Sequence, residues 1–138
     1  MTIPAIEMEE VAVSYTERGQ PVEALRGLNL QVREGTVFGF LGPNGAGKTT
    51  TMHVLLGFAA FSKGAARVFG QDVRQAIARA RIGYLPENPQ MYPFLTGREL
   101  LTMAGQLFLM RGQALNIRVD ELLEQVNLQK AANRRIAT

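Results

Sequence analysis

The sequence predicts an α/β fold organised around a glycine-rich loop, and three observations support this. Residues 42–50 are rich in glycine and stand between an apolar stretch, 37–41, and a stretch without helix breakers, 50–56. Upstream, apolar and polar residues alternate, as in strands with one solvated face. Downstream, apolar residues recur at helical spacing. We therefore expect a small antiparallel sheet that leads into part of a parallel-sheet core, followed by helices.

Two strands are expected before the loop. Residues 6–15 show partial alternation, and residues 24–32 alternate more clearly towards their end. The polar residues 16–21 between them predict a turn.

A strand, a loop and a helix follow one another at the centre of this arrangement. Residues 37–41 are apolar except for one glycine, which predicts a strand buried on both faces, as in a parallel sheet. A helix is expected over residues 50–56, with Gly57 as its C-cap.

The loop fits the pattern G-x-x-x-x-G-K-[ST], which cradles the phosphates of nucleoside triphosphates. Gly45 and Gly47 have no Cβ, so backbone N–H groups can approach phosphate oxygens, and the following helix adds unpaired N–H groups. Lys48 can reach the β- and γ-phosphates, and the Thr49 hydroxyl can ligate Mg²⁺. We therefore predict Mg-ATP binding here; the alternative is a glycine-rich turn before a core helix. The predicted nucleotide-binding residues of the loop are Gly42, Pro43, Asn44, Gly45, Ala46, Gly47, Lys48, Thr49 and Thr50.

Shorter elements are expected after the loop helix. Residues 65–69 predict a strand, residues 73–80 a helix capped by Asp72, and residues 82–85 a further strand that Pro86 ends. Three prolines then restrict the backbone of the connecting loop.

Two helices are expected in the remaining sequence. Thr96 and Glu99 match a capping box, which predicts a helix from there to about Arg111. Residues 115–126 predict another, and residues 127–138 a short one at most.

Composition excludes several classes of protein. The sequence has no cysteine, which excludes a disulfide framework and a cysteine–zinc site. It has no apolar run long enough to span a bilayer and no signal peptide at its start, so we expect a cytosolic chain. The net charge of +3 is spread along the chain, and without a basic face we expect no nucleic-acid partner.

Several segments together resemble a known family. These segments are residues 24–30, 41–50, 66–70, 81–87 and 95–99. In these segments, and from about residue 6 to residue 138, the chain resembles the ATP-binding subunit of an ABC transporter. The order Tyr84-Leu85-Pro86-Glu87 is similar to the branch whose ATPase pairs with a separately encoded export permease.

The resemblance implies an ABC-type P-loop NTPase fold that is present in part. Residues 1–138 would form one partial domain, with the ATP-binding core up to about residue 86. The Q-loop region and part of the helical subdomain would follow from about residue 87. The whole protein would be an ATPase that couples Mg-ATP binding and hydrolysis to export through a membrane permease.

The resemblance also implies roles for single residues. Tyr15 matches the aromatic residue that stacks on adenine, although it can also be an ordinary strand tyrosine. Glu87 stands where most of the family has a glutamine that touches Mg²⁺ and senses the permease. Its carboxylate could reach Mg²⁺ through water, or it could be a solvated loop acid.

Two protein partners are implied. Residues 87–95 would receive the permease's coupling helix, unless their apolar side chains pack on the domain's own helices. A second ATP-binding subunit would close over the nucleotide. The chain would then lie on the cytoplasmic face of the cell membrane, held there through the permease. The apolar contact residues would be Met91, Tyr92, Pro93 and Phe94.

The family's serine-glycine-glycine signature and second acidic motif do not occur in these 138 residues. Asp120 and Glu121 lie in a helical period and do not follow a buried strand, so they do not match that motif. We therefore expect these residues alone to bind ATP with little or no hydrolysis and to be weakly stable. The alternatives are a short non-hydrolysing regulatory protein and a soluble ABC-type ATPase of translation or DNA repair. A GTPase is disfavoured, because no Asn-Lys-x-Asp motif occurs.

Overall fold

The computed structural model describes residues 3–137. It divides between Tyr84 and Leu85 into two compact units, and each is described here by itself. None of the helices in this described part has the length and apolar content that crossing a membrane requires.

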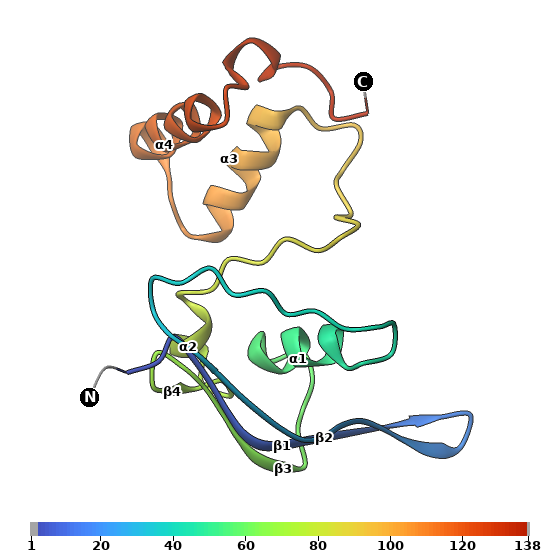
Figure 1. Ribbon diagram of the computed structural model, residues 1–138. Helices are drawn as coiled ribbons and strands as arrows, with labels where there is room; N and C mark the ends of the chain where they lie inside the picture. The colour runs from blue at the N-terminus through green and yellow to red at the C-terminus, as the bar shows by residue number, and fades with distance from the viewer. Residues whose placement is uncertain (1–2, 138) are drawn as a thin grey trace. The chain divides into compact units, whose positions relative to one another are not determined.

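The first unit contains a four-stranded sheet with the order β2-β1-β3-β4 (Figure 1). The strands are β1 (Ile6–Glu17), β2 (Gln20–Val32), β3 (Lys63–Val68) and β4 (Gln71–Asp72). Every pair of neighbours is antiparallel. The strands predicted at 6–15, 24–32 and 65–69 are confirmed, because their alternation reflects one buried and one solvated face.

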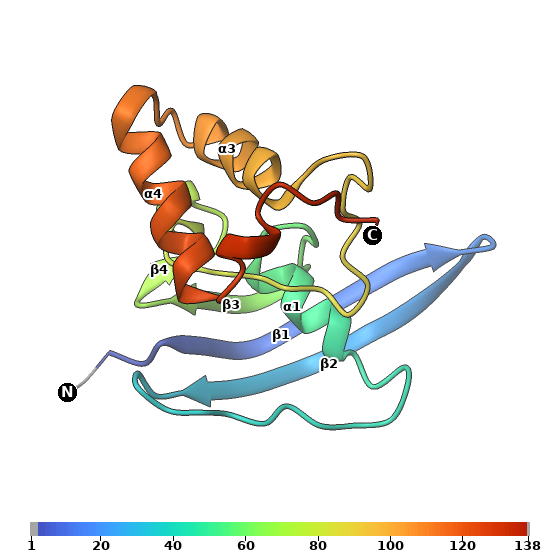
Figure 2. The same ribbon diagram turned by 90° about the horizontal axis from the view of Figure 1, so that it is seen from above.

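The turn between β1 and β2 is tighter than the sequence predicted. Only Arg18 and Gly19 connect the strands, and both are left-handed, with φ of 50° and 78°. This is the geometry of a two-residue hairpin turn. Because β3 pairs with β1 only as far as Ala12, the β1–β2 hairpin extends beyond the rest of the sheet, as Figure 2 shows.

Helix α1 (Lys48–Leu55) packs on one face of this sheet. Its buried Val54 and Leu55 join Met8, Val11 and Val13 of β1 in the main core. Gly57 ends the helix in a left-handed conformation, with φ 73°, and its N–H donates to the Val54 carbonyl at 3.0 Å. The predicted glycine C-cap is therefore confirmed.

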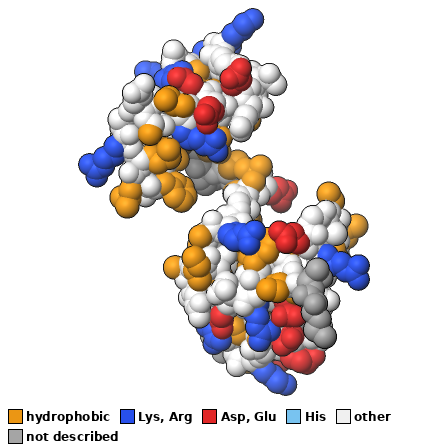
Figure 3. All heavy atoms as spheres, turned by 90° about the vertical axis from the view of Figure 1, so that its left-hand side faces the viewer, with side chains coloured by type: hydrophobic (Ala, Val, Ile, Leu, Met, Phe, Trp, Pro, Cys, Tyr) orange, Lys and Arg blue, Asp and Glu red, His pale blue; other side chains and the backbone are white. Residues whose placement is uncertain are grey.

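The predictions of a parallel-sheet strand at 37–41 and of a short strand at 82–85 are wrong for this structure. Both segments are irregular, and Val37, Leu41 and Leu85 are strongly exposed. A strand needs a hydrogen-bonding neighbour. In the described residues, every strand is already part of the antiparallel sheet. The burial expected from the apolar composition of 37–41 is wrong as well, because the segment has no partner strand to cover it. In Figure 3 hydrophobic side chains accordingly lie at the surface of both units.

Helix α2 (Ala76–Arg79) is shorter than the predicted 73–80, and Asp72 does not cap it. The residue at the N-cap is Gln75. The Asp72 carboxylate instead binds Arg74, whose Nε and backbone N–H both donate to it at 2.9 Å. These bonds, of which the side-chain bond is the stronger influence, lower the pKa of Asp72 to about 2. A local ion pair therefore replaced the predicted cap.

The second unit begins its helical part with α3 (Gly97–Leu107). The predicted capping box is confirmed: the Glu99 N–H donates to Thr96 Oγ1 at 3.2 Å, and the Thr96 N–H donates to the Glu99 carboxylate at 2.8 Å. The helix ends before the predicted Arg111, because the chain turns through Leu109 with φ 62°.

Helix α4 (Gly112–Gln125) and the 3₁₀ turn η1 (Gln129–Ala131) complete this unit. The helix and the short terminal turn predicted here are confirmed. Leu115, Val119 and Leu123 of α4 are buried together with Ala132. Leu101 of α3 packs against this cluster, so the second unit has its own small core.

Candidate nucleotide-binding loop

Residues 42–47 form a turn that delivers the chain into the first turn of α1. Gly45 and Gly47 are left-handed, with φ of 81° and 83°, a conformation that costs other residues energy. The Ala46 N–H donates to the Pro43 carbonyl at 3.2 Å and closes the turn. The loop residues up to Ala46 are exposed, so a ligand can reach them.

The Lys48 side chain folds back over the loop. Its Nζ donates to the carbonyl oxygens of Gly42 at 2.6 Å and Pro43 at 2.7 Å. These bonds hold the ammonium group above the turn, and they use two of its three N–H donors. The loop is thereby arranged around a positive charge before any ligand is bound.

The start of α1 adds a second source of positive potential. Lys48, Thr49 and Thr50 open the helix, and helix geometry leaves the first N–H groups without partners along the helix. The macrodipole adds partial positive charge at this end. Thr49 is exposed, so its hydroxyl is accessible to a metal ion. These groups fit a triphosphate with a hard cation, whose preferred ligands are oxygens.

Gly47 is packed against strand β2, whereas Gly45 is not. A Cβ at Gly47 would lie 2.6 Å from Leu25 Cδ2 and 2.7 Å from the Ala24 carbonyl oxygen. A Cβ at Gly45 would meet no atom within 4 Å. Gly45 and Ala46 also border a hollow of about 370 Å³, whose other walls are residues 23–28 of β2. Strand β2 therefore supports the back of the loop, while its front is open.

Sequence reasoning missed two residues of this support. Leu25 was placed in a strand but not beside the loop, because alternation does not show what a strand face contacts. Thr51 is fully buried, and its hydroxyl donates to the Gly47 carbonyl at 2.9 Å. No local sequence signal distinguishes either residue from its neighbours.

Tyr15 lies on the same hairpin as Leu25. It faces Val22 across the hairpin, two residues beyond Val13, whose partner is Leu25. The tyrosine is 43% exposed and can accept a stacked ring. Its contact with adenine remains a prediction.

Thr49 and Glu87 belong to different units, so their pairing at Mg²⁺ also remains a prediction. Glu87 is exposed in the second unit. Within residues 3–137, no group of three or more histidine, cysteine or acidic side chains could hold a metal ion by itself. The predicted permease contact is likewise exposed within its own unit at Met91, Tyr92 and Phe94, and the last two rings lie 5.9 Å apart.

Three other polar residues, His53, Asp120 and Glu121, contact neighbouring side chains. His53 lies within α1, and its ring makes an edge contact with Phe58 at 6.1 Å. Asp120 pairs with Arg98 at 2.7 Å, and Glu121 pairs with Arg118 one turn away. Asp120 and Glu121 lie within α4 and not after a strand, as the sequence predicted.

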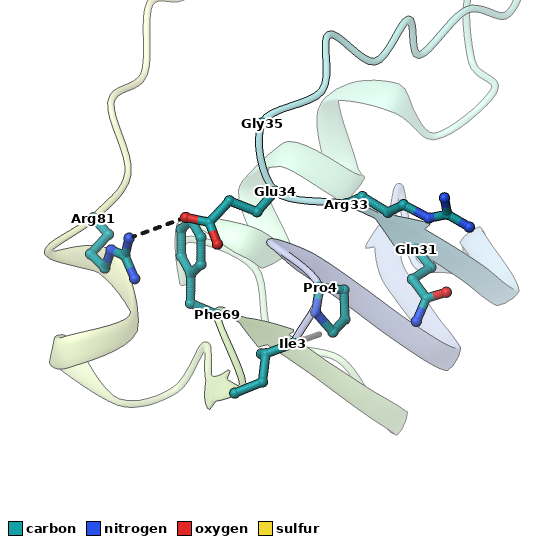
Figure 4. Close-up of a pocket in the computed structure, with 8 residues that line it drawn as sticks. All are labelled: Ile3, Pro4, Gln31, Arg33, Glu34, Gly35, Phe69 and Arg81. Carbon is teal, nitrogen blue, oxygen red and sulfur yellow. Dashed lines mark ion pairs between the residues drawn. The ribbon is translucent and has the colours of Figure 1, made fainter. Parts of the chain in front are cut away.

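A second hollow, of about 1020 Å³, is lined by no residue of the loop (Figure 4). Arg81 points across it towards Glu34, with Nη2 3.9 Å from the carboxylate. The Arg81 guanidinium also lies 3.7 Å from the centre of the Phe69 ring. The Glu34 carboxylate brings a negative charge to this hollow, whereas Lys48 is bonded to neutral carbonyl groups, so the loop suits a phosphate better.

Comparisons with known proteins indicate one family. A family model described as "ABC transporter" matches residues 25–138. An uncharacterized ABC transporter ATP-binding protein of Nostoc sp. is 44% identical over 112 residues, which are 81% of this chain and 33% of that protein. The Nod factor export ATP-binding protein I of Paraburkholderia xenovorans is 40% identical over 96% of this chain and 43% of its own length. A daunorubicin resistance ATP-binding protein of Streptomyces coeruleorubidus is 42% identical over 94% and 40%, respectively. The chain therefore spans less than half the length of these relatives.

Solved structures give the same result. An ATP-binding subunit of an ABC transporter matches with a TM-score of 0.75 and 25% identity over 95% of this chain and 54% of that chain. A dimeric ATP-binding cassette, bound to ADP and Pi after hydrolysis, matches with a TM-score of 0.78 at 22% identity over 95% and 61%. The latter likeness shows the fold alone. The predicted partial α/β fold of the ABC type is confirmed, and the chain belongs to the ABC transporter family.

Proposed function

We propose that residues 42–50 bind the phosphates of ATP together with Mg²⁺, and that the chain is part of the ATP-binding component of an exporter. The observation that carries this proposal is the loop closed around Lys48, whose Nζ lies 2.6 Å and 2.7 Å from two loop carbonyls. A triphosphate would exchange these neutral acceptors for charged ones, which form stronger bonds with an ammonium group.

The site would divide the work among four groups. Backbone N–H groups of the loop and the first turn of α1 would bind phosphate oxygens, and Lys48 would pair with the β- and γ-phosphates. Thr49, with Glu87 through water, would hold Mg²⁺, which bridges phosphate oxygens and reduces their charge. Tyr15 would stack on adenine.

The proposed export role is supported by the names of two relatives and by the sequence of residues 84–87. Two of the relatives are named for Nod factor export and daunorubicin resistance. By extension, the whole protein would couple ATP hydrolysis to export through a separate permease, on the cytoplasmic face of the membrane. The exposed Met91, Tyr92 and Phe94 are the apolar residues that would meet the permease. A second ATP-binding subunit would complete the nucleotide site.

Titration calorimetry with Mg-ATP tests the site. Lys48→Ala should weaken binding by about 1–3 kcal/mol, the cost of removing a charged hydrogen-bond partner. Lys63→Ala provides the matched control, because Lys63 is an exposed lysine of the same unit that lies in β3. Equal ATP affinity in the Lys48→Ala variant and the unsubstituted chain would show that the loop is not the site.

A further inference from the structure

We propose that Leu25 of β2 is a positioning residue for the phosphate loop and so a determinant of triphosphate affinity. The proposal rests on the proposed function of residues 42–50, and it adds a residue outside the motif. Leu25 would not touch the nucleotide. It would act by fixing where Gly47, and therefore Lys48, lies.

Gly47 is held by contacts with both β2 and α1. On the strand side, the space that a Cβ would fill is occupied by Leu25 Cδ2 and the Ala24 carbonyl oxygen, at 2.6 Å and 2.7 Å. On the helix side, Thr51 donates both its backbone N–H, at 2.8 Å, and its hydroxyl, at 2.9 Å, to the Gly47 carbonyl. Gly47 thus has little freedom to move while β2 and α1 keep their places.

The rest of the loop has fewer supports. Gly45 has no atom within 4 Å of the position of a Cβ. The turn is closed by the Ala46 N–H and by the two bonds that Lys48 Nζ donates to Gly42 and Pro43. Since Lys48 directly follows Gly47, a shift of Gly47 would move both the ammonium group and the first N–H groups of α1. Small misplacements of binding groups reduce their effect strongly.

Leu25 is suited to this role because it is itself fixed. It is 7% exposed and packs in the main core with Val13 and Val54. Val13 is also its partner across the hairpin. The side chain that touches Gly47 is therefore anchored to the sheet and to α1 together.

A simple core residue would behave differently from a positioning residue. Loss of a core side chain lowers the free energy of unfolding. Loss of a positioning side chain also lowers the affinity of molecules that remain folded. Inorganic tripolyphosphate with Mg²⁺ is the appropriate probe, because it reports on the loop without the adenine contact.

The experiment measures tripolyphosphate and ATP affinity by calorimetry on the full chain, under conditions where each variant is folded by circular dichroism. Leu25→Ala should lower the affinity for both ligands by about tenfold, which corresponds to a partial loss of aligned phosphate contacts. Leu25→Met, which keeps the volume, should restore most of the affinity. Val73→Ala, in the same core cluster, should lose stability but keep its affinity.

Equal affinity in Leu25→Ala and Val73→Ala would overturn the proposal. If Leu25→Ala does not fold, Leu25→Val takes its place. Valine suits a strand and withdraws one methylene from Gly47, and unchanged affinity in that variant would equally overturn the proposal. Lys48→Ala in the same series distinguishes the Leu25 proposal from the phosphate-site proposal. If Lys48→Ala leaves the tripolyphosphate affinity unchanged, residues 42–50 are not the phosphate site.

Discussion

Two glycines of the phosphate loop share a backbone conformation but differ in their surroundings. Both are left-handed, which only glycine adopts without cost. Behind Gly47 lie Leu25 and Ala24, whereas the space beside Gly45 is open. The motif specifies glycine at position 47 and leaves position 45 open, and it does not show that Leu25 and Ala24 lie behind Gly47.

Alanine substitution should separate these two effects. Gly45→Ala should lower the free energy of unfolding by about 1–2 kcal/mol, the cost of a left-handed alanine. Gly47→Ala should cost about 1–3 kcal/mol more, because its Cβ would overlap Leu25 and the Ala24 carbonyl. Urea denaturation without nucleotide measures both values. Equal losses would mean that β2 does not press on Gly47.

Tyr15 provides a second test at the scale of single residues. If its ring stacks on adenine, Tyr15→Ala should weaken ATP binding by about 1–1.5 kcal/mol and leave tripolyphosphate binding unchanged. Tyr15→Phe keeps the ring and should bind both ligands as the unsubstituted chain does. Calorimetry with the two ligands provides the comparison. A parallel loss of tripolyphosphate affinity in Tyr15→Ala would show that the residue acts on the loop and not on the base.

Among the elements, α3 shows how local chemistry fixes a helix start. The Thr96 backbone N–H donates to the Glu99 carboxylate, and this bond is the main reason why the pKa of Glu99 lies below its ordinary value of 4.5. A lowered folded-state pKa means that the ionised form stabilises the folded state. That stabilisation is complete above pH 4.5 and is lost as the pH falls through the lower folded-state pKa.

Glu99→Gln should reveal this pH dependence. Glutamine can still accept a hydrogen bond from Thr96, but it does not titrate. The unsubstituted chain should therefore be the more stable one near neutral pH, and its advantage should shrink as the pH falls below 4.5. Chemical denaturation at a series of pH values measures the difference. Glu124→Gln on α4 is the control, and a difference that stays constant with pH would contradict the account.

The elements predicted correctly are those with local signals. The capping box, the glycine C-cap at Gly57 and the strand alternation each depend on residues close in sequence. The errors lie where a missing or competing partner decided the structure. Residues 37–41 have the composition of a buried strand but no neighbouring strand in the described chain. Asp72 had the chemistry of a cap but formed an ion pair with Arg74.

At the scale of the whole molecule, exposed apolar segments are the main feature. Val37, Phe38 and Leu41 precede the loop, and Leu85 follows the first unit; all are at least half exposed. Such surface favours association, because burial of apolar area is favourable wherever it occurs. The chain should therefore be weakly stable and should self-associate.

Thermal unfolding with light scattering tests that expectation. The chain should lose structure at a low temperature and scatter light as it does so. Phe38→Ser combined with Val37→Ser should reduce the scattering, since both side chains are exposed and make no core contact to lose. A cooperative transition with a high midpoint and no scattering would contradict the expectation.

The candidate site was largely predictable because its motif is contiguous. Nine consecutive residues, 42–50, carry the glycines, the lysine and the threonine. What the sequence did not predict is the support from β2. Leu25 is 22 positions before Gly47, and nothing in the spacing links the two. Their contact results from the packing of the β1–β2 hairpin against α1.

The central claim is that the phosphates of ATP bind at residues 42–50. Backbone amide chemical shifts, measured by NMR as Mg-ATP is added, test it most directly. The largest changes should fall on Gly45, Gly47, Lys48 and Thr49, and tripolyphosphate should reproduce them. Changes centred instead on Arg33 and Arg81, beside the second hollow, would contradict the claim and place the ligand elsewhere.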